Sequence, residues 1–186
     1  AISKDDGNSI EARVHPTLIP EGSLLANVNE AYNALYISGD AVGNVMFYGP
    51  GAGMMPTGSA VVSDLVDVAR NILNNSMGRV PYFGYQPNRV KPRTIKSPRD
   101  LMAKYYFRVS AHDRPGVLSK ISGILGENDI SIESVHQKGR DLVGAVPIVM
   151  ITHEAREAAV YAALSRIDDL DVVKDKTVMI RIEDWA

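Results

Sequence analysis

The sequence predicts an α+β protein whose second half forms a complete small domain. Three observations support this. Phe107, Val109 and Ala111 alternate with polar residues, as in a half-buried strand. An amphipathic helix follows at once, with its apolar face formed by Val117, Leu118, Ile121, Ile124 and Leu125. Residues 104–186 then continue as strand, strand, helix and strand, and this βαββαβ order is the ferredoxin-like plan.

The remaining elements of the second half follow from apolar periodicity. Strands are predicted at 130–136, 145–152 and 177–183, and 138–144 is predicted to be a loop. A helix is predicted at 156–170, with its apolar face formed by Ala159, Val160, Ala163, Leu164 and Ile167. Val178, Ile180 and Ile182 are expected to face the core. Pro147 has no N–H to donate, so it is expected at the start of its strand or at a bulge.

The sequence of the first half predicts an incomplete sheet and one long helix. Strands are expected at 11–19, 34–38 and 45–48, with a short helix or turn at 24–32. The helix at 60–73 carries a wide apolar stripe formed by Val61, Leu65, Val68 and Ile72. Three short strands and one such helix do not bury their own apolar surface, so a packing partner is expected.

Composition excludes several classes of function. The chain has 186 residues, a formal net charge of −2, 45% hydrophobic residues and no cysteine. Disulfides, thiolate metal sites and a cysteine nucleophile are therefore excluded. No apolar run suits a membrane span, and the four histidines lack metal-site spacing, so a cytoplasmic protein without metal is expected. The basic stretch 89–99 is interpreted as a solvated face, which leaves little support for nucleic-acid binding.

A proline-rich segment separates the two halves. Residues 74–102 carry four prolines and several basic residues without apolar periodicity, which is typical of an extended tether. The predicted division is therefore a first segment at 1–78, a linker at 79–103 and a second domain at 104–186.

The turn before the second-half helix has the chemistry of an amino-acid site. Pro115 is expected at the first helical position, and Gly116 leaves the backbone bare where helix N–H groups favour a carboxylate. Asp113 beside them is able to accept from an ammonium group. A plainer interpretation also stands, in which Asp113 caps the helix and Gly116 is a turn glycine.

These residues resemble the ACT domain, a ligand-sensing module of amino-acid metabolism. Asp113-Arg-Pro-Gly-Val-Leu118 is similar to its Asp-x-Pro-Gly-x-Leu loop, and Asn128-Asp-Ile-Ser-Ile132 to the segment that opens its second strand. The resemblance implies an effector between two ACT domains of a homodimer or larger homo-oligomer. The implied effector-binding residues are Asp113, Arg114, Gly116, Val117, Leu118, Asn128 and Ile130. The alternative is an ACT module that only oligomerises.

A glycine-rich loop precedes the long helix of the first half. Gly49-Pro-Gly-Ala-Gly53 joins a strand to a helix, the general layout of a nucleotide contact. The loop lacks both the Gly-x-Gly-x-x-Gly pattern and the Gly-Lys-Ser/Thr of a Walker A loop, so alone it also suits a plain turn.

In combination with its neighbours the loop resembles homoserine dehydrogenase. Val14-His-Pro-Thr-Leu-Ile-Pro20, Asn33-Ala-Leu-Tyr-Ile-Ser-Gly-Asp-Ala-Val-Gly43 and Pro56-Thr-Gly-Ser-Ala-Val-Val-Ser-Asp-Leu65 carry the likeness. It implies interconversion of aspartate semialdehyde and homoserine with NADP or NAD, in threonine, methionine and isoleucine biosynthesis. Gly53 and Gly51 are the implied cofactor contacts, and threonine is the implied feedback effector. The dinucleotide fingerprint and catalytic lysine are expected upstream of Ala1, so no catalytic residue is assigned and this chain alone is expected to be inactive.

Overall fold

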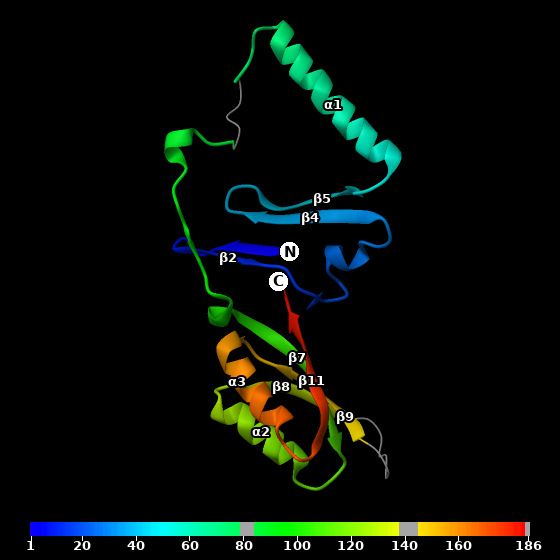
Figure 1. The fold of residues 1–186 in the computed structure, drawn as a ribbon, viewed down its shortest axis with the longest axis vertical. Helices are drawn as coiled ribbons and strands as arrows, with labels where there is room; N and C mark the ends of the chain where they lie inside the picture. The colour runs from blue at the N-terminus through cyan, green and yellow to red at the C-terminus, as the bar shows by residue number, and fades with distance from the viewer. Residues whose placement is uncertain (79–83, 138–144, 185–186) are drawn as a thin grey trace. The chain divides into compact units, whose positions relative to one another are not determined.

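The computed structural model describes residues 1–78, 84–137 and 145–184, and these form two compact units (Figure 1). One unit combines residues 1–20 with 93–186, and the other contains residues 21–92. The first twenty residues thus pack with the C-terminal part of the chain. The predicted boundaries at 78 and 104 instead place these residues in a separate first segment. The predicted loop at 138–144 and part of the predicted linker, 79–83, lie outside the described residues.

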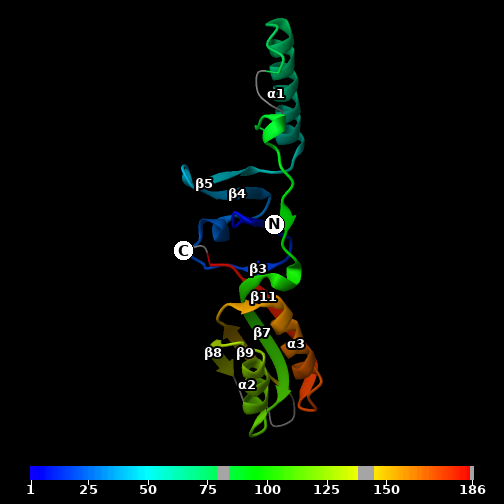
Figure 2. The same cartoon turned by 90° about the vertical axis from the view of Figure 1, so that its left-hand side faces the viewer.

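The larger unit is built on a six-stranded sheet with two helices on one face (Figures 1 and 2). Its strands lie in the order β3 (Thr17–Leu18), β11 (Val173–Ile182), β7 (Met102–His112), β9 (Ala145–Thr152) and β8 (Ile132–Gln137), and β10 (Ala155–Arg156) also pairs with β7. The helices are α2 (Val117–Glu127) and α3 (Glu157–Asp168). Along the chain, β7, α2, β8, β9, α3 and β11 follow the predicted βαββαβ order, which is confirmed.

The core lies between this sheet and its helices. Tyr105, Phe107 and Val109 of β7 are fully buried, because the odd-numbered residues of the strand all face the helices. Ile121 of α2 and Ile167 of α3 are equally buried against them. Burial of each large apolar side chain contributes about 1.5–3 kcal/mol, so this face supplies most of the domain's hydrophobic stabilisation.

The predicted orientation of the last strand is wrong. Met179 lies opposite Phe107 and packs against the core, whereas Val178 is 37% exposed. The register of β11 on β7 shifts twice between Val173 and Val178, which sets the even-numbered residues on the face away from the helices. The sequence alternation was correct, but it did not show which of the two faces the helices cover.

Pro147 lies where its missing N–H is tolerated. It is the third residue of β9, opposite Ser110 of β7, and its side chain is exposed. On the other side, the last described pair between β8 and β9 joins Gln137 to Ile148, so Pro147 lies beyond it. Pro147 is therefore not the first residue of the strand, and the described pairing with β7 has no bulge at it, so neither predicted position is observed there.

The N-terminal residues supply three short strands. β1 (Ile2–Asp5) pairs antiparallel with β2 (Ser9–Arg13), and β6 (Thr94–Ile95) lies parallel to β2. The single strand predicted at 11–19 is thus divided into β2 and β3, with Pro16 between them. The described linker residues are also fixed at one point, since the N–H of Lys96 donates to Ile10 O at 2.9 Å.

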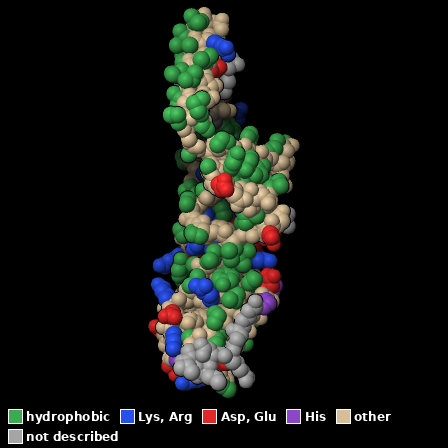
Figure 3. Space-filling model, turned by 90° about the vertical axis from the view of Figure 1, so that its right-hand side faces the viewer, with side chains coloured by type: hydrophobic (Ala, Val, Ile, Leu, Met, Phe, Trp, Pro, Cys, Tyr) green, Lys and Arg blue, Asp and Glu red, His purple; other side chains and the backbone are tan. Residues whose placement is uncertain are grey.

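The smaller unit contains a hairpin and an exposed helix. β4 (Tyr32–Gly39) pairs antiparallel with β5 (Gly43–Pro50), and α1 (Met54–Leu73) follows. Short 3-10 turns lie at Leu24–Asn27 and Pro87–Arg89, with a further one at Pro98–Asp100 of the larger unit. The helix begins six residues earlier than predicted and has no buried residue, and hydrophobic side chains follow its length (Figure 3). None of the described helices combines the length and apolar character that a membrane crossing needs.

Candidate functional site

The turn between β7 and α2 presents bare backbone to solvent. Gly116 is the N-cap of α2, with a left-handed φ of 89° and no side-chain cap. A Cβ added there would meet nothing within 4 Å, so the space above the turn is open. Because the first N–H groups of a helix have no acceptor within it, this end is able to hold an anion. Pro115 lies in the turn before the helix, so its predicted place at the first helical position is wrong.

Asp113 is not a helix cap. Its carboxylate accepts from Nε2 of Gln137 in β8 at 3.4 Å, and its side chain is exposed beside the turn. Arg114 is exposed as well, whereas Val117 is only 5% exposed and points into the core. Asp113, Arg114 and the backbone at Gly116 are therefore the exposed groups of this turn, whereas the side chain of Val117 is buried and its N–H donates to Arg114 O at 3.3 Å.

The other predicted effector segment lies at the far end of α2. Asn128 is the C-cap, and its Nδ2 donates to Ile124 O at 2.8 Å. Ile130 is 3% exposed, with its N–H donating to Leu125 O at 2.9 Å. The helix between the two segments has 11 residues, so they lie about 16 Å apart at 1.5 Å per residue. One chain therefore does not bring them together around a small amino acid.

The glycine loop joins β5 to α1. Gly53 is the N-cap of α1 with a φ of 131°, a conformation that residues with a side chain rarely adopt. Gly51 donates its N–H to Ala31 O at 3.3 Å, and Asn33 occupies the position of the missing Cβ of Gly51. Both glycines are exposed, so their bare backbone is open to solvent beside the N-terminus of the 20-residue helix α1. This arrangement suits contact with a planar ring or a polar group.

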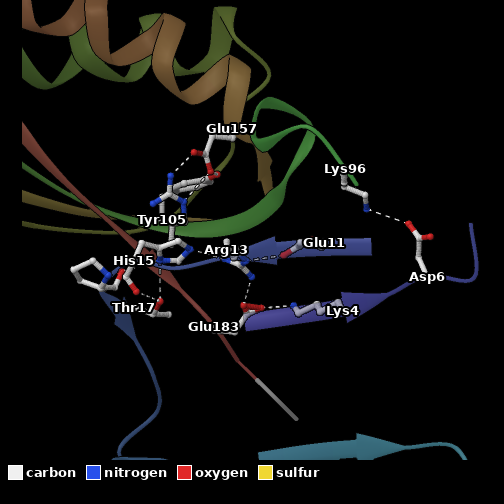
Figure 4. Close-up of polar contacts among 12 residues, drawn as sticks. Lys4, Asp6, Glu11, Arg13, His15, Thr17, Lys96, Tyr105, Glu157 and Glu183 are labelled. Carbon is white, nitrogen blue, oxygen red and sulfur yellow. Dashed lines mark hydrogen bonds and ion pairs between the residues drawn. The ribbon is translucent and has the colours of Figure 1, made fainter. Parts of the chain in front are cut away.

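A buried ion cluster connects the N-terminal strands to the end of β11 (Figure 4). Arg13 donates to Oε2 of Glu183 at 2.5 Å, and Lys4 pairs with Oε1 of the same carboxylate. The Nε of Arg13 lies 2.6 Å from Oε1 of Glu11, in an ion pair without hydrogen-bond geometry. No local sequence pattern predicts this cluster. The spacing of Glu11 and Arg13 along a strand indicates a shared face, but it does not indicate a partner 170 residues away.

A second polar group fixes α3 to the sheet. Tyr105 donates its hydroxyl to Glu157 Oε2 at 3.2 Å, and Nε of Arg181 donates to the same oxygen at 2.8 Å. Burial, followed by the Glu157 charge, raises the pKa of Tyr105 well above its ordinary value. The hydrogen bond to Glu157 raises the pKa of Arg181. No described group of three or more His, Cys, Asp or Glu side chains suits a metal ion.

Comparison with known proteins identifies both parts of the chain. The homoserine dehydrogenase family model matches residues 2–66, and the ACT domain model matches residues 105–171. The first part of the chain therefore matches the homoserine dehydrogenase family and the second part matches the ACT domain, in the order that the resemblance implies. The ACT match ends before β11, so this strand and Glu183 lie beyond it, although they complete the sheet.

Relatives within the family cover nearly the whole chain. Homoserine dehydrogenase from Neisseria gonorrhoeae is 42% identical over 182 residues, which is 98% of this chain and 42% of that protein. The Bacillus subtilis enzyme is 39% identical over 98% of this chain and 41% of its own. A homoserine dehydrogenase structure from Thiobacillus denitrificans has 44% identity and a TM-score of 0.87, covering 99% of this chain and 41% of that chain. The chain therefore spans about two fifths of the length of the relatives it matches.

Proposed function

We propose that this chain is the C-terminal part of a cytoplasmic enzyme that interconverts L-aspartate 4-semialdehyde and L-homoserine with NADP or NAD. Its ACT domain senses an amino acid, and threonine is the expected feedback effector. The observation that carries the proposal is the order of the two matches, at residues 2–66 and 105–171, in a chain about 40% identical to homoserine dehydrogenases.

The catalytic groups are assigned to polypeptide outside these residues. Reduction of an aldehyde needs a proton donor beside the acceptor of the hydride. Lys4 is the only lysine before Lys91, and its ammonium group pairs with Glu183 in the ion cluster. It is therefore engaged in holding the fold and is not available as that donor. The relatives are more than twice as long as this chain, which leaves room for the fingerprint and catalytic lysine.

The glycine loop is the part of this chain assigned to the cofactor. NADPH or NADH supplies the hydride for the aldehyde. Gly53 offers an uncovered backbone, which lets the nicotinamide ring approach closely. The N–H groups at the start of α1 point along the helix dipole, so they favour a polar or negative group beside the loop. Gly53 therefore serves by leaving room for the nicotinamide ring.

The effector is assigned to a site shared by two ACT domains. The N–H groups around Gly116 hold the carboxylate of the amino acid, and Asp113 accepts from its ammonium group. Asn128 and Ile130 of a second copy close the site, because the same segments of one chain are separated by the length of α2. The outer edge of β11 is occupied by β3, whereas β8 ends the described sheet order, so β8 is the edge offered to a second copy.

Calorimetry with threonine, isoleucine and methionine tests the sensing role. Threonine is expected to give heat with the 186-residue chain, and Asp113→Ala is expected to reduce its affinity. Absence of heat from all three amino acids removes the sensing claim. The alternative, an ACT domain that only oligomerises, predicts a dimer whose melting temperature does not change with any amino acid.

Enzyme assays test the assignment of the chemistry. The complete polypeptide is expected to oxidise NADPH with aspartate semialdehyde, and the 186-residue chain alone is expected not to. Turnover by the purified 186-residue chain contradicts the placement of the catalytic groups outside it.

A further inference from the structure

We propose that Asn33 positions the glycine loop for the cofactor, and that Gly51 lacks a side chain because Asn33 occupies its space. The inference rests on the proposed use of this loop in cofactor binding. Asn33, a residue of β4, thereby gains a role in cofactor binding. Glycine is found at positions 51 and 53 for two different reasons.

The glycine loop is held against the start of β4. Tyr32 pairs with Pro50 in the hairpin register, and the N–H of Gly51 donates to Ala31 O at 3.3 Å. The rings of Tyr32 and Tyr48 stack with centroids 4.9 Å apart and planes 4° from parallel. The backbone of residues 31–33 therefore forms the wall beside which the loop leaves β5.

The side chain of Asn33 projects from this wall and reaches Gly51. A Cβ built on Gly51 would lie 1.5 Å from Nδ2 of Asn33 and 2.5 Å from its Cγ. The direction in which Gly51 would project a side chain is thus filled by the Asn33 carboxamide. A cofactor does not occupy the same volume, so close cofactor approach is not what requires glycine at position 51.

Gly53 differs in this respect. Its φ of 131° disfavours any residue with a side chain, and an added Cβ would meet Pro56 at 3.3 Å. Position 53 therefore needs glycine for its backbone conformation, whereas a side chain at position 51 would have to displace the Asn33 carboxamide. The backbone conformation of Gly53 concerns the loop alone, whereas the Asn33 carboxamide beside Gly51 couples the loop to β4.

The carboxamide is suited to hold the loop in one place. It fills the space above a bare Cα two residues before Gly53, and it carries two donors and two acceptor lone pairs at an exposed edge. An alanine at position 51 moves the far end of this side chain, and an alanine at position 33 removes it. Both changes release the same contact, so both are expected to weaken cofactor binding by the same route.

A double-mutant cycle in the complete enzyme tests the inference. Asn33→Ala and Gly51→Ala are each expected to raise KM for NADPH about tenfold and to change kcat less than about twofold. The double variant is expected to resemble the worse single variant. Gly22→Ala is the matched control, because Gly22 lies outside the loop and a Cβ there meets nothing within 4 Å, and its KM is expected to stay at the wild-type value. A wild-type melting temperature in each variant establishes that the fold is intact.

Two results overturn the inference itself. A wild-type KM in Asn33→Ala removes the positioning role. A KM increase in the double variant near the product of the two single increases, about a hundredfold, makes Gly51 independent of Asn33. Absence of NADPH turnover by the wild-type enzyme is a different result, since it removes the proposed function on which the inference rests. Asn33→Ser, a smaller polar replacement, substitutes for the alanine variant if that variant does not fold.

Discussion

Arg13 and Glu183 form a buried ion pair between two ends of the described chain. Nη2 of Arg13 lies 2.5 Å from Oε2 of Glu183, and the two side chains are only 4% and 8% exposed. Directly beside them, the N–H of Glu183 donates to Leu18 O at 2.9 Å, where β3 pairs with β11. The segment that matches homoserine dehydrogenase is thus bonded to the last strand of the ACT sheet through both side chain and backbone.

Removing one charge of this pair is expected to destabilise the larger unit strongly. Glu183→Gln leaves Arg13 buried with an amide in place of a carboxylate, which costs about 3–5 kcal/mol. Urea unfolding followed by circular dichroism measures the change. Asp184→Asn is the matched control, since Asp184 is exposed and adjacent, and its unfolding midpoint is expected to remain at the wild-type value. Equal midpoints for Glu183→Gln and wild type contradict the prediction.

Replacing both members of the pair is expected to be much milder. Arg13→Met with Glu183→Met removes both charges of the pair, so Arg13 is no longer a buried cation without its Glu183 partner and a part of the lost stability returns. Lys4 and Glu11 then lose their partner, and a part of the loss is expected to remain. A double variant less stable than Glu183→Gln would show that the fold requires the charges themselves.

Stability is expected to fall at alkaline pH because of Tyr105. Its pKa in the folded protein lies above the ordinary value of 10.0, since burial and the Glu157 charge disfavour the phenolate. The unfolded chain loses the proton near pH 10 while the folded chain keeps it. This contribution to the free energy of unfolding is therefore complete below pH 10 and is lost progressively as the pH rises from there toward the raised pKa of folded Tyr105. Melting temperatures measured from pH 8 to 11 should fall less steeply for Tyr105→Phe than for the wild type.

Two glycines of the α2 region are expected to respond in opposite ways to alanine. Gly116→Ala forces a side chain into a left-handed conformation and costs about 1–2 kcal/mol. Gly123→Ala, inside α2 with nothing within 4 Å of the added Cβ, is expected to stabilise by about 0.5–1 kcal/mol. Urea unfolding of the two variants measures both changes. A stabilising Gly116→Ala is the outcome that contradicts the observed turn geometry.

The apolar surface of α1 is expected to drive self-association of the 186-residue chain. Leu65 is 64% exposed and Val68 is 51% exposed, on a helix without a buried residue. Leu65→Lys is expected to shift sedimentation profiles toward the monomer, and Ser63→Lys adds the same charge at an exposed polar position as a control. Equal profiles for both variants would show that this surface does not associate.

Elements with local signals were predictable, and contacts between distant segments were not. The strand around Phe107 and the helix from Val117 carry their periodicity within a few residues, so both follow from the sequence. The inward face of β11 was predicted wrongly, because a register shift changes the orientation without changing the alternation. The pairing of Leu18 with Ile182 leaves no local pattern at all.

The candidate sites show the same limit. The bare turn at Gly116 was predictable, because a glycine directly before a helix is typical of a backbone conformation that side chains disfavour. The φ of Gly53 was not, because the helix was predicted to begin at residue 60 and begins at Met54. That Asn33 fills the space beside Gly51 was not, because the hairpin register sets it across some eighteen residues of chain. Burial directs the side chain of Val117 away from the surface of the turn, and the position of Val117 in the sequence did not show this.

The parallel pairing of β3 with β11 determines when folding is able to finish. Residues 17–18 are synthesised before their partners at 181–182, which emerge some 160 residues later. Closing so long a loop lowers the chain entropy before any contact compensates, and folding dominated by such distant contacts is slow. On the ribosome, β3 must therefore remain unpaired with the ACT sheet until translation has passed Glu183.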